Sequence, residues 1–314
     1  MSTKKLIIHF FCLLLVIATT FTSKVVTAED GGTNVFFPNS KCSKGKRKRK
    51  ICVKLGCKFV KRSNNCITKR QNKKKPGEDD GNVEKIKRIL FVGNSFTYYN
   101  DMPISLFKKI AISLGKKVIV NTNGKQGGST LGSNLFSQKT KKAVRKYVSY
   151  THIVLQEQSA MLQFSSYNTR YAQTYRHVPA WNKICVAKKA TPVLFQTWAY
   201  YNGYGVYDTY QAMQTRLLYG YNGLQAKFNV LGGKDSVIAH VGSAWSMAYE
   251  NLQDKSALYN YDGRHPGKLG SYLAALTIYC TIYRESPIGA YIPSGISANI
   301  SAQVQEYAWL ACDK

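Results

Sequence analysis

Five short apolar runs alternate with segments of helical pattern from Lys85 onward. This alternation favours βαβ units, in which parallel strands form one sheet and helices cover both of its faces. The pattern continues over about 230 residues without a repeat of fixed period, which predicts a single three-layer α/β/α domain over residues 85–314. The expected strands are Ile89–Val92, Val118–Val120, Ile153–Leu155, Val193–Phe195 and Val237–Ala239, and the expected helices are Pro103–Leu114, Tyr171–Lys188, Tyr210–Lys227 and Lys268–Tyr283.

The first residues have the layout of a secretory signal peptide. Lys4 and Lys5 precede the uncharged run Leu6–Ser23, and small residues follow that run. A membrane anchor is the alternative, but the apolar core Leu6–Ala18 is too short to span about 30 Å of hydrocarbon. We therefore expect residues 1–28 to be cleaved, the mature protein to be secreted, and no stable membrane insertion after cleavage.

Residues 29–66 are expected to form a small module with four cysteines, Cys42, Cys52, Cys57 and Cys66. In an oxidising compartment these favour two disulfides, because so small and charged a segment cannot bury a useful core. Three pairings are possible. A zinc site is the competing interpretation, but the spacing lacks a Cys-x-x-Cys pair. Residues 67–84 are predicted to be a polar linker. Three cysteines remain further on, for which one pair and one free thiol is the simplest arrangement: Cys185, Cys280 and Cys312.

Positive charge is concentrated in this module. Residues 41–75 contain 16 Lys or Arg and no acidic residue, whereas residues 83–314 contain 26 basic and 11 acidic residues. Such a run attracts polyanions by counterion release, and outside a cell these are sulfated or uronic-acid glycans rather than nucleic acid. A solvated basic arm is the alternative. The candidate polyanion-binding residues are Lys46, Arg47, Lys48, Arg49 and Lys50.

A serine follows the first expected strand directly, in Gly93-Asn94-Ser95-Phe96-Thr97. Open α/β sheets carry their sites at the carboxyl edge of the strands, where this serine would lie. A hydroxyl becomes a good nucleophile when a base takes its proton, so a histidine must come close to Ser95. His152 and His240 lie in apolar strand patterns and His177 lies within an expected helix, which leaves His265.

His265 lies in the turn-rich loop Tyr261-Asp262-Gly263-Arg264-His265-Pro266. Asp262, three residues earlier, can fold back to hold the imidazole tautomer and stabilise its charged form. By itself an Asp-x-x-His pattern is more often a satisfied surface turn. By the same caution, a serine before a helix is often only a helix cap.

The ordered blocks GNSFT, NGKQGGSTLG, LQEQS and DGRHP resemble the SGNH/GDSL hydrolase superfamily over roughly residues 86–290. The resemblance implies a flavodoxin-like α/β/α sandwich with a five-stranded parallel sheet. It implies that Ser95 is the nucleophile and an oxyanion donor through its backbone N–H, and that His265 and Asp262 complete a catalytic triad. The second block supplies a glycine N–H, matched by Gly127 or Gly128, of which Gly128 fits better by position.

Two blocks depart from the family pattern. Gly-Asn-Ser replaces the usual Gly-Asp-Ser, and the third block contains glutamines where the family has an asparagine that donates to the oxyanion. Gln158 is the positional match and Gln156 the alternative. The departures resemble a less-characterised subgroup with a Gln-containing third block.

The resemblance implies a serine esterase that hydrolyses carboxylic esters, and the signal peptide predicts that it is secreted. No cofactor is expected, and no metal ion, because the few histidines show no spaced ligand cluster with carboxylates. Family analogy suggests O-acetyl groups on glycans as substrates, and transfer of the acyl group to another hydroxyl stays open. The competing hypothesis is an extracellular protein that binds acidic polysaccharides through its basic module and whose hydrolase domain is secondary or silent. Trp198 and Tyr200 follow the fourth strand, where they would line a sugar or acyl pocket or serve in packing.

Overall fold

The computed structural model of the chain describes residues 57–60, 65–68, 85–164 and 169–312. Contacts divide the chain into two compact units, residues 1–80 and 81–314. In the first unit, strand β1 (Cys57–Val60) pairs antiparallel with β2 (Asn65–Thr68). The expected signal peptide, Cys42, Cys52 and the basic residues 46–50 lie outside the described residues.

The second unit contains a sheet of five parallel strands in the order β4-β3-β5-β6-β7. Its strands are β3 (Lys87–Val92), β4 (Val118–Thr122), β5 (His152–Leu155), β6 (Thr191–Phe195) and β7 (Val237–Ala239). All five coincide with the apolar runs of the sequence, and only the first four are longer by one to two residues at an end. The chain adds β4 on one side of β3 and then crosses to add β5 on the other side. The carboxyl ends of β3, β4 and β5 therefore lie together at the edge where open α/β sheets bind ligands.

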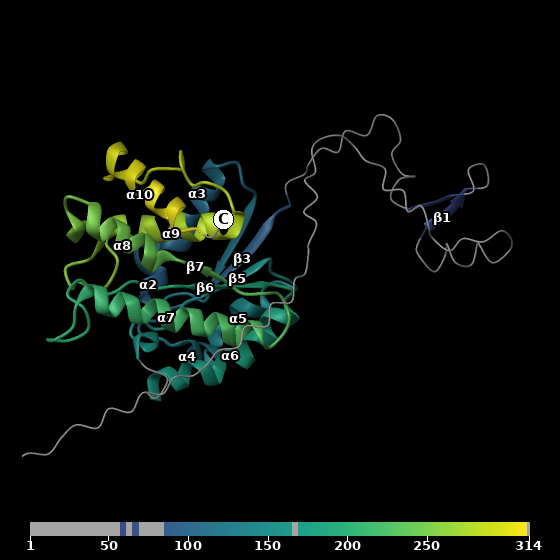
Figure 1. Cartoon of the computed structure of the whole chain (residues 1–314), viewed down its shortest axis with the longest axis horizontal. Helices are drawn as coiled ribbons and strands as arrows, with labels where there is room; N and C mark the ends of the chain where they lie inside the picture. The colour runs from purple at the N-terminus through teal and green to yellow at the C-terminus, as the bar shows by residue number, and fades with distance from the viewer. Residues whose placement is uncertain (1–56, 61–64, 69–84, 165–168, 313–314) are drawn as a thin grey trace, which may run out of the picture. The chain divides into compact units, whose positions relative to one another are not determined.

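Helices cover both faces of this sheet (Figure 1). One layer contains α3 (Lys108–Ser113), α8 (Val241–Asn251), α9 (Lys268–Tyr283) and α10 (Ala298–Leu310). The other contains α4 (Leu131–Phe136), α5 (Gln138–Arg145), α6 (Thr169–Ala187) and α7 (Tyr210–Asn229). The shorter elements are α2 (Ser95–Tyr98), η2 (Tyr99–Asp101), η3 (Met102–Phe107), η4 (Met161–Gln163) and η5 (Lys255–Leu258). The observed architecture is the three-layer α/β/α sandwich with a five-stranded parallel sheet that the sequence predicts.

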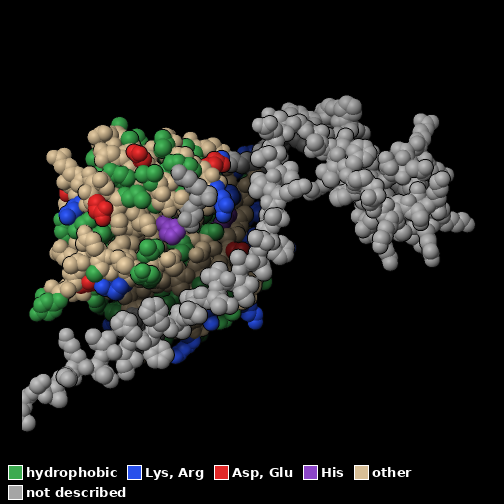
Figure 2. Space-filling view, in the orientation of Figure 1, with side chains coloured by type: hydrophobic (Ala, Val, Ile, Leu, Met, Phe, Trp, Pro, Cys, Tyr) green, Lys and Arg blue, Asp and Glu red, His purple; other side chains and the backbone are tan. Residues whose placement is uncertain are grey.

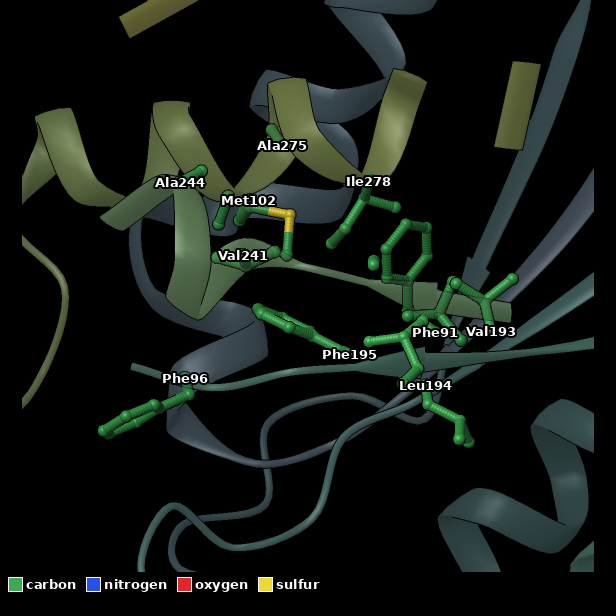
Figure 3. Packing of buried hydrophobic residues seen from close by; sticks show 14 of the residues in the cluster. Phe91, Phe96, Met102, Val193, Leu194, Phe195, Val241, Ala244, Ala275 and Ile278 are labelled. Carbon is green, nitrogen blue, oxygen red and sulfur yellow. The ribbon is translucent and has the colours of Figure 1, made fainter. Parts of the chain in front are cut away.

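Alternate strand residues fill the two sides of the sheet. Val193 lies on the side of the sheet where α9 carries Ile278, whereas Leu194 points to the opposite layer (Figure 3). This follows from the two-residue period of a strand. Helix α9 is buried along almost its whole length, which agrees with a helix whose apolar residues occur on every side. It packs against α8, α10 and η3 and is therefore the central helix of this layer, with almost no surface exposed to solvent.

The helix expected over Pro103–Leu114 consists of two parts. A π-helical turn, η3, contains Pro103 and is followed by the regular helix α3. Asn100 and Asp101 just before it adopt left-handed backbone conformations, with φ of 53° and 49°. The chain therefore bends between the end of α2 and η3, which no simple apolar period reveals.

Two of the three cysteines of this unit form a disulfide. Cys280 of α9 is bonded to Cys312, which follows α10. Cys185 is a free thiol, and its burial raises its pKa to about 12. This is the arrangement of one pair and one free thiol expected from the sequence.

His152 gives the fold an acid-sensitive point at the start of β5. Burial, followed by the positive charges of Lys87 and Lys234, lowers the pKa of His152 from 6.5 to about 3. Between pH 6.5 and about pH 3, the unfolded chain therefore binds a proton at His152 that the folded chain does not bind. The stability lost through this residue increases as the pH falls from 6.5 toward about 3.

We predict that His152→Gln makes the free energy of unfolding less sensitive to acid. Urea unfolding of both proteins at about pH 7 and about pH 5 gives two changes in free energy, and the decrease on acidification should be larger for the native chain. Comparing these changes cancels the contribution of other titrating groups. Equal decreases in the free energy of unfolding for the two proteins would contradict the conclusion that His152 makes the fold sensitive to acid.

Candidate active site

Ser95 lies at the tight turn between β3 and α2. The side chain of Asn94 caps α2 by accepting a hydrogen bond from the N–H of Phe96 at 3.1 Å, and Ser95 is 7 % exposed. A Cβ on Gly93 would lie 2.1 Å from Oγ1 of Thr97 and 2.5 Å from Oε1 of Gln156. The turn thus requires glycine before Asn94, and it holds the serine hydroxyl at the carboxyl edge of the sheet.

The loop before α9 is held in shape by its own backbone and by Asp262. Oδ1 of Asp262 accepts hydrogen bonds from the N–H groups of Arg264 at 3.0 Å and His265 at 2.9 Å. The indole N–H of Trp198 donates to the carbonyl of Arg264 at 3.1 Å. Gly263 has a φ of 65°, a conformation that favours glycine. The loop is therefore anchored to the segment that follows β6.

The two loops bring three predicted residues together in one hydrogen-bonded chain. Nε2 of His265 lies 2.9 Å from Oγ of Ser95, and Nδ1 of His265 is bonded to Oδ2 of Asp262. Partial burial disfavours the charged form of Asp262, but hydrogen bonds from His265 and from the N–H groups of Arg264 and His265 outweigh it and hold its pKa below the usual range. A carboxylate, an imidazole and a hydroxyl in this order can transfer the serine proton to the imidazole.

Aromatic rings fix the orientation of the imidazole. The ring of Tyr99 stacks on His265 with centroids 4.5 Å apart, and Phe96 contacts it edge-on at 5.6 Å. Phe96 in turn stacks on Trp198, which is completely buried and stacks on Trp245. Trp198 therefore belongs to the packing behind the site, whereas Tyr200 lines a cavity beside it.

Asn100 ties the segment after Ser95 to the segment after His265. Its amide nitrogen lies within hydrogen-bond distance of the carbonyls of Pro266 (3.3 Å) and Gly267 (3.2 Å) and of Oγ of Ser271 (2.8 Å). This contact joins residues more than 160 positions apart. The sequence predicts no role for Asn100 or Tyr99, although both closely follow the GNSFT block.

The glycine loop after β4 lies against the serine turn. Nδ2 of Asn94 donates to the carbonyl of Ser129 at 2.9 Å, and Oγ of Ser129 donates to the carbonyl of Gly93 at 3.3 Å. Gly128, the residue before Ser129, has a φ of 62°. A Cβ on Gly127 would lie 3.6 Å from the hydroxyl of Tyr98. The expected glycine block is thus adjacent to Ser95.

The two glutamines of the third block have different positions. Gln156 is fully buried, and its Oε1 accepts hydrogen bonds from the N–H of Asn94 at 2.8 Å and the hydroxyl of Thr97 at 2.9 Å. Its Nε2 donates to the carbonyl of Glu157. Its oxygen therefore supports the serine turn, whereas its nitrogen is bonded to the backbone of the third block itself. The alternative assignment of Gln156 as an oxyanion donor stays a prediction.

Gln158 is only half-buried. Its Oε1 accepts from the N–H of Ala160 at 3.0 Å, which orients the amide, and its Nε2 makes a longer contact of 3.3 Å with Oγ of Ser159. An amide NH₂ group has two donors. One contacts Ser159, and the side chain of Gln158 also forms a hydrogen bond with that of Tyr200.

A cavity of about 680 Å³ borders the same loop. It is lined by residues 200–211 in large part, by Tyr249, and by Asp262, Gly263 and Arg264, but Ser95 and His265 are not among its lining residues. A smaller cavity of about 190 Å³ lies beside Glu157 and His177. The larger space is therefore next to Asp262 rather than over the serine hydroxyl.

In the described part of the chain, no three His, Cys, Asp or Glu side chains gather into a group that could hold a metal ion. Within the same residues, no helix combines the length and apolarity needed to cross a bilayer.

The comparisons with known proteins agree with this fold. No protein-family model and no curated protein matches the chain. A DUF4886 family protein from Bacteroides uniformis matches with a TM-score of 0.59 at 19 % identity, over 72 % of this chain and 95 % of its own. A candidate SGNH hydrolase from Slackia heliotrinireducens matches with a TM-score of 0.47 at 26 % identity, over 62 % of this chain and 98 % of its own. An acetylxylan esterase from Geobacillus stearothermophilus matches with a TM-score of 0.43 at 13 % identity, over 66 % of this chain and 97 % of its own. The chain shares its fold with the DUF4886 family protein.

We predict that Asn94→Asp slows the reaction of Ser95 with a fluorophosphonate probe by about tenfold or more. Aspartate can still cap α2, but it cannot donate to the carbonyl of Ser129, so the glycine loop loses its tether. The second-order labelling rate measures this effect. Asn182→Asp is the matched control, because it also removes an amide that donates to a backbone carbonyl, that of Gly232 at 3.0 Å, in another part of the fold. Equal labelling rates for the native chain and Asn94→Asp would contradict the prediction.

Proposed function

We propose that the protein is a secreted serine esterase. The observation that carries the proposal is the hydrogen-bonded chain from Ser95 through His265 to Asp262. The shared fold supports an ester hydrolase in general terms, and the pattern of residues 1–28 supports secretion.

The geometry supports a two-step reaction. Oγ of Ser95 attacks the ester carbonyl carbon while Nε2 of His265 takes the hydroxyl proton. The bond to the alcohol then breaks, and His265 gives that proton to the departing oxygen, which leaves an acyl group on Ser95. Water attacks this acyl group with His265 again as base, and the acid and the free serine are released. Asp262 holds the imidazole through Nδ1 and stabilises its positive charge.

Three donors are proposed for the oxyanion that forms during each attack. They are the backbone N–H of Ser95 at the start of α2, the N–H of Gly128 and the amide of Gln158. The contact between Ser129 and Asn94 supports the position of the glycine, and the half-buried position of its side chain supports the glutamine. Loss of one such donor typically lowers kcat by about 10²–10³-fold.

The cavity beside Asp262 supports a bulky alcohol part in the substrate. Its volume of about 680 Å³ is within the size range of ligand sites, and several tyrosines line it. Aromatic rings are suited to the apolar faces of sugar units. We therefore propose O-acetyl groups on glycans as the ester substrates.

We predict that Ser95→Ala abolishes hydrolysis of p-nitrophenyl acetate, with kcat reduced by at least about 10³-fold. The matched control is Ser149→Ala, which removes a hydroxyl from the loop before β5, at the opposite edge of the sheet. Circular dichroism and melting curves establish that both variants are folded. Unchanged hydrolysis in Ser95→Ala would overturn the proposal, whereas loss in this variant alone would support it.

A second function, binding of acidic extracellular polysaccharides, is favoured by the charge of residues 41–75. In this proposal the basic run holds the enzyme on an acidic matrix and raises the local concentration of its esters.

We predict that deleting residues 41–75 shifts elution from a heparin column to a lower salt concentration, because fewer counterions are released on binding. Hydrolysis of p-nitrophenyl acetate by the shortened chain shows that the α/β domain is intact. Elution at the same salt concentration as the full chain would contradict a role of this segment in binding.

A further inference from the structure

The cavity beside the triad contains a positively charged side chain in addition to its tyrosines. Its lining includes three charged residues, Asp208, Asp262 and Arg264. Each carboxylate is already engaged by a neighbour, since Asp208 is paired with Arg216 and Asp262 is bonded to His265. Among the described residues, no carboxylate forms an ion pair with Arg264. Of the three charged side chains that line the cavity, Arg264 is therefore the one available to bind a ligand.

The position of Arg264 is well defined. Its N–H donates to Asp262, its carbonyl accepts from the indole of Trp198, and its guanidinium lies 5.1 Å from the ring centroid of Tyr200. Tyr200 is itself held by its hydroxyl, which is 2.7 Å from Oγ of Ser159. The guanidinium thus has a fixed backbone and a fixed aromatic surface beneath it, while its N–H donors remain open to a ligand.

Among the tyrosines that line the cavity, Tyr200 and Tyr210 are buried, whereas Tyr201 and Tyr249 are half-buried and can offer ring surface to a ligand. The hydroxyl of Tyr249 donates to the carbonyl of Tyr201, and that of Tyr210 is 3.1 Å from Oγ of Ser246. Lys255 lies over Tyr249, with its amine 4.2 Å from the ring centroid, and adds positive charge at this side. Two further tyrosines near the cavity are almost entirely exposed, Tyr207 at 100 % and Tyr261 at 98 %.

We propose that this cavity is a subsite for an acidic glycan, and that Arg264 binds a carboxylate of a uronic-acid unit next to the ester. A guanidinium presents parallel N–H donors that match the two oxygens of a carboxylate. The tyrosines pack against the apolar faces of the sugar rings. Arg264 is therefore a specificity-determining residue, one position from the base His265. This inference rests on the proposed esterase function and names its substrate class.

The charge of the whole α/β domain is consistent with such a ligand. Residues 83–314 carry 26 basic and 11 acidic residues. On the face shown in Figure 2, acidic side chains are few and separated from one another. A field of this sign increases the rate at which an acidic chain encounters the protein.

Binding is tested in the Ser95→Ala protein, which cannot turn over an ester, by titration calorimetry with trigalacturonate and with uncharged xylotriose. We expect trigalacturonate to bind and Arg264→Gln to weaken that binding about 10- to 100-fold, the range expected for a charged hydrogen bond. Arg264→Lys should give an intermediate affinity, because it keeps the charge and loses the planar fork. Arg145→Gln on α5 is the matched control: it removes an equal charge from an exposed site on the other layer and should leave the affinity unchanged.

The same variants in the active protein are compared on acetylated polygalacturonate and acetylated xylan. The ratio of kcat/KM for the acidic to the neutral substrate should fall about 10- to 100-fold in Arg264→Gln, chiefly through KM. Using this ratio removes any general effect on the neighbouring triad. Absence of trigalacturonate binding, an equal loss in Arg145→Gln, or an unchanged ratio would each overturn the subsite. Failure of the esterase proposal would instead appear as serine-independent hydrolysis of p-nitrophenyl acetate, with the calorimetric binding intact.

Discussion

The hydrogen bond between Ser95 and His265 joins residues that are 170 positions apart, and the arrangement of the site depends on it. Such a bond forms only if two separate loops are held to within a fraction of an ångström. The serine turn is fixed by the space that Gly93 leaves for Thr97, and the histidine loop by the two N–H groups that bind Asp262. Asn100 then connects the two segments directly. The imidazole is positioned from both sides before any substrate is present.

The hydrogen bonds that hold the serine turn come largely from neutral amide side chains. Gln156 accepts two hydrogen bonds in a fully buried position, where a charged group would be costly to desolvate. Asn94 both accepts from Phe96 and donates to Ser129, which a carboxylate cannot do. The departure from the usual aspartate at Asn94 thus has a physical reason: the amide supplies a donor as well as an acceptor.

Glu157 is the contrasting case next to these amides. Its carboxyl is almost completely buried, and burial raises its pKa even though Thr174 and the N–H groups of Gln158 and Leu131 donate to it and act in the opposite direction. One oxygen thereby joins the third block to the first residue of α4. The block that follows β5 is therefore connected on one side to the serine turn through Gln156 and on the other to the layer of α4 and α6 through Glu157.

The sequence predicts those features that depend on local pattern. Buried parallel strands appear as short apolar runs, and α9 has the predicted bounds because Lys268–Tyr283 is apolar between a turn and Arg284. Helices α4 and α5 were not predicted, because segments of six and eight residues give little periodic signal. Helices α8 and α10 were missed as well. The roles of Asn94, Asn100 and Gln156 depend on which carbonyl or N–H group the folded chain brings near them, and no spacing in the sequence contains that information.

One loop, residues 261–266, contains both His265 and residues that line the larger cavity. Asp262 orients His265, while Arg264 between them faces the larger space. Because the N–H and carbonyl of Arg264 are both bonded, a ligand held by its guanidinium cannot easily pull the backbone away and displace the imidazole. The side chain can adjust to a ligand while the backbone stays fixed. In the proposed mechanism, recognition of a large alcohol part and activation of the serine would thus be adjacent in the chain, yet the hydrogen bonds of the backbone would keep movement in one from disturbing the other.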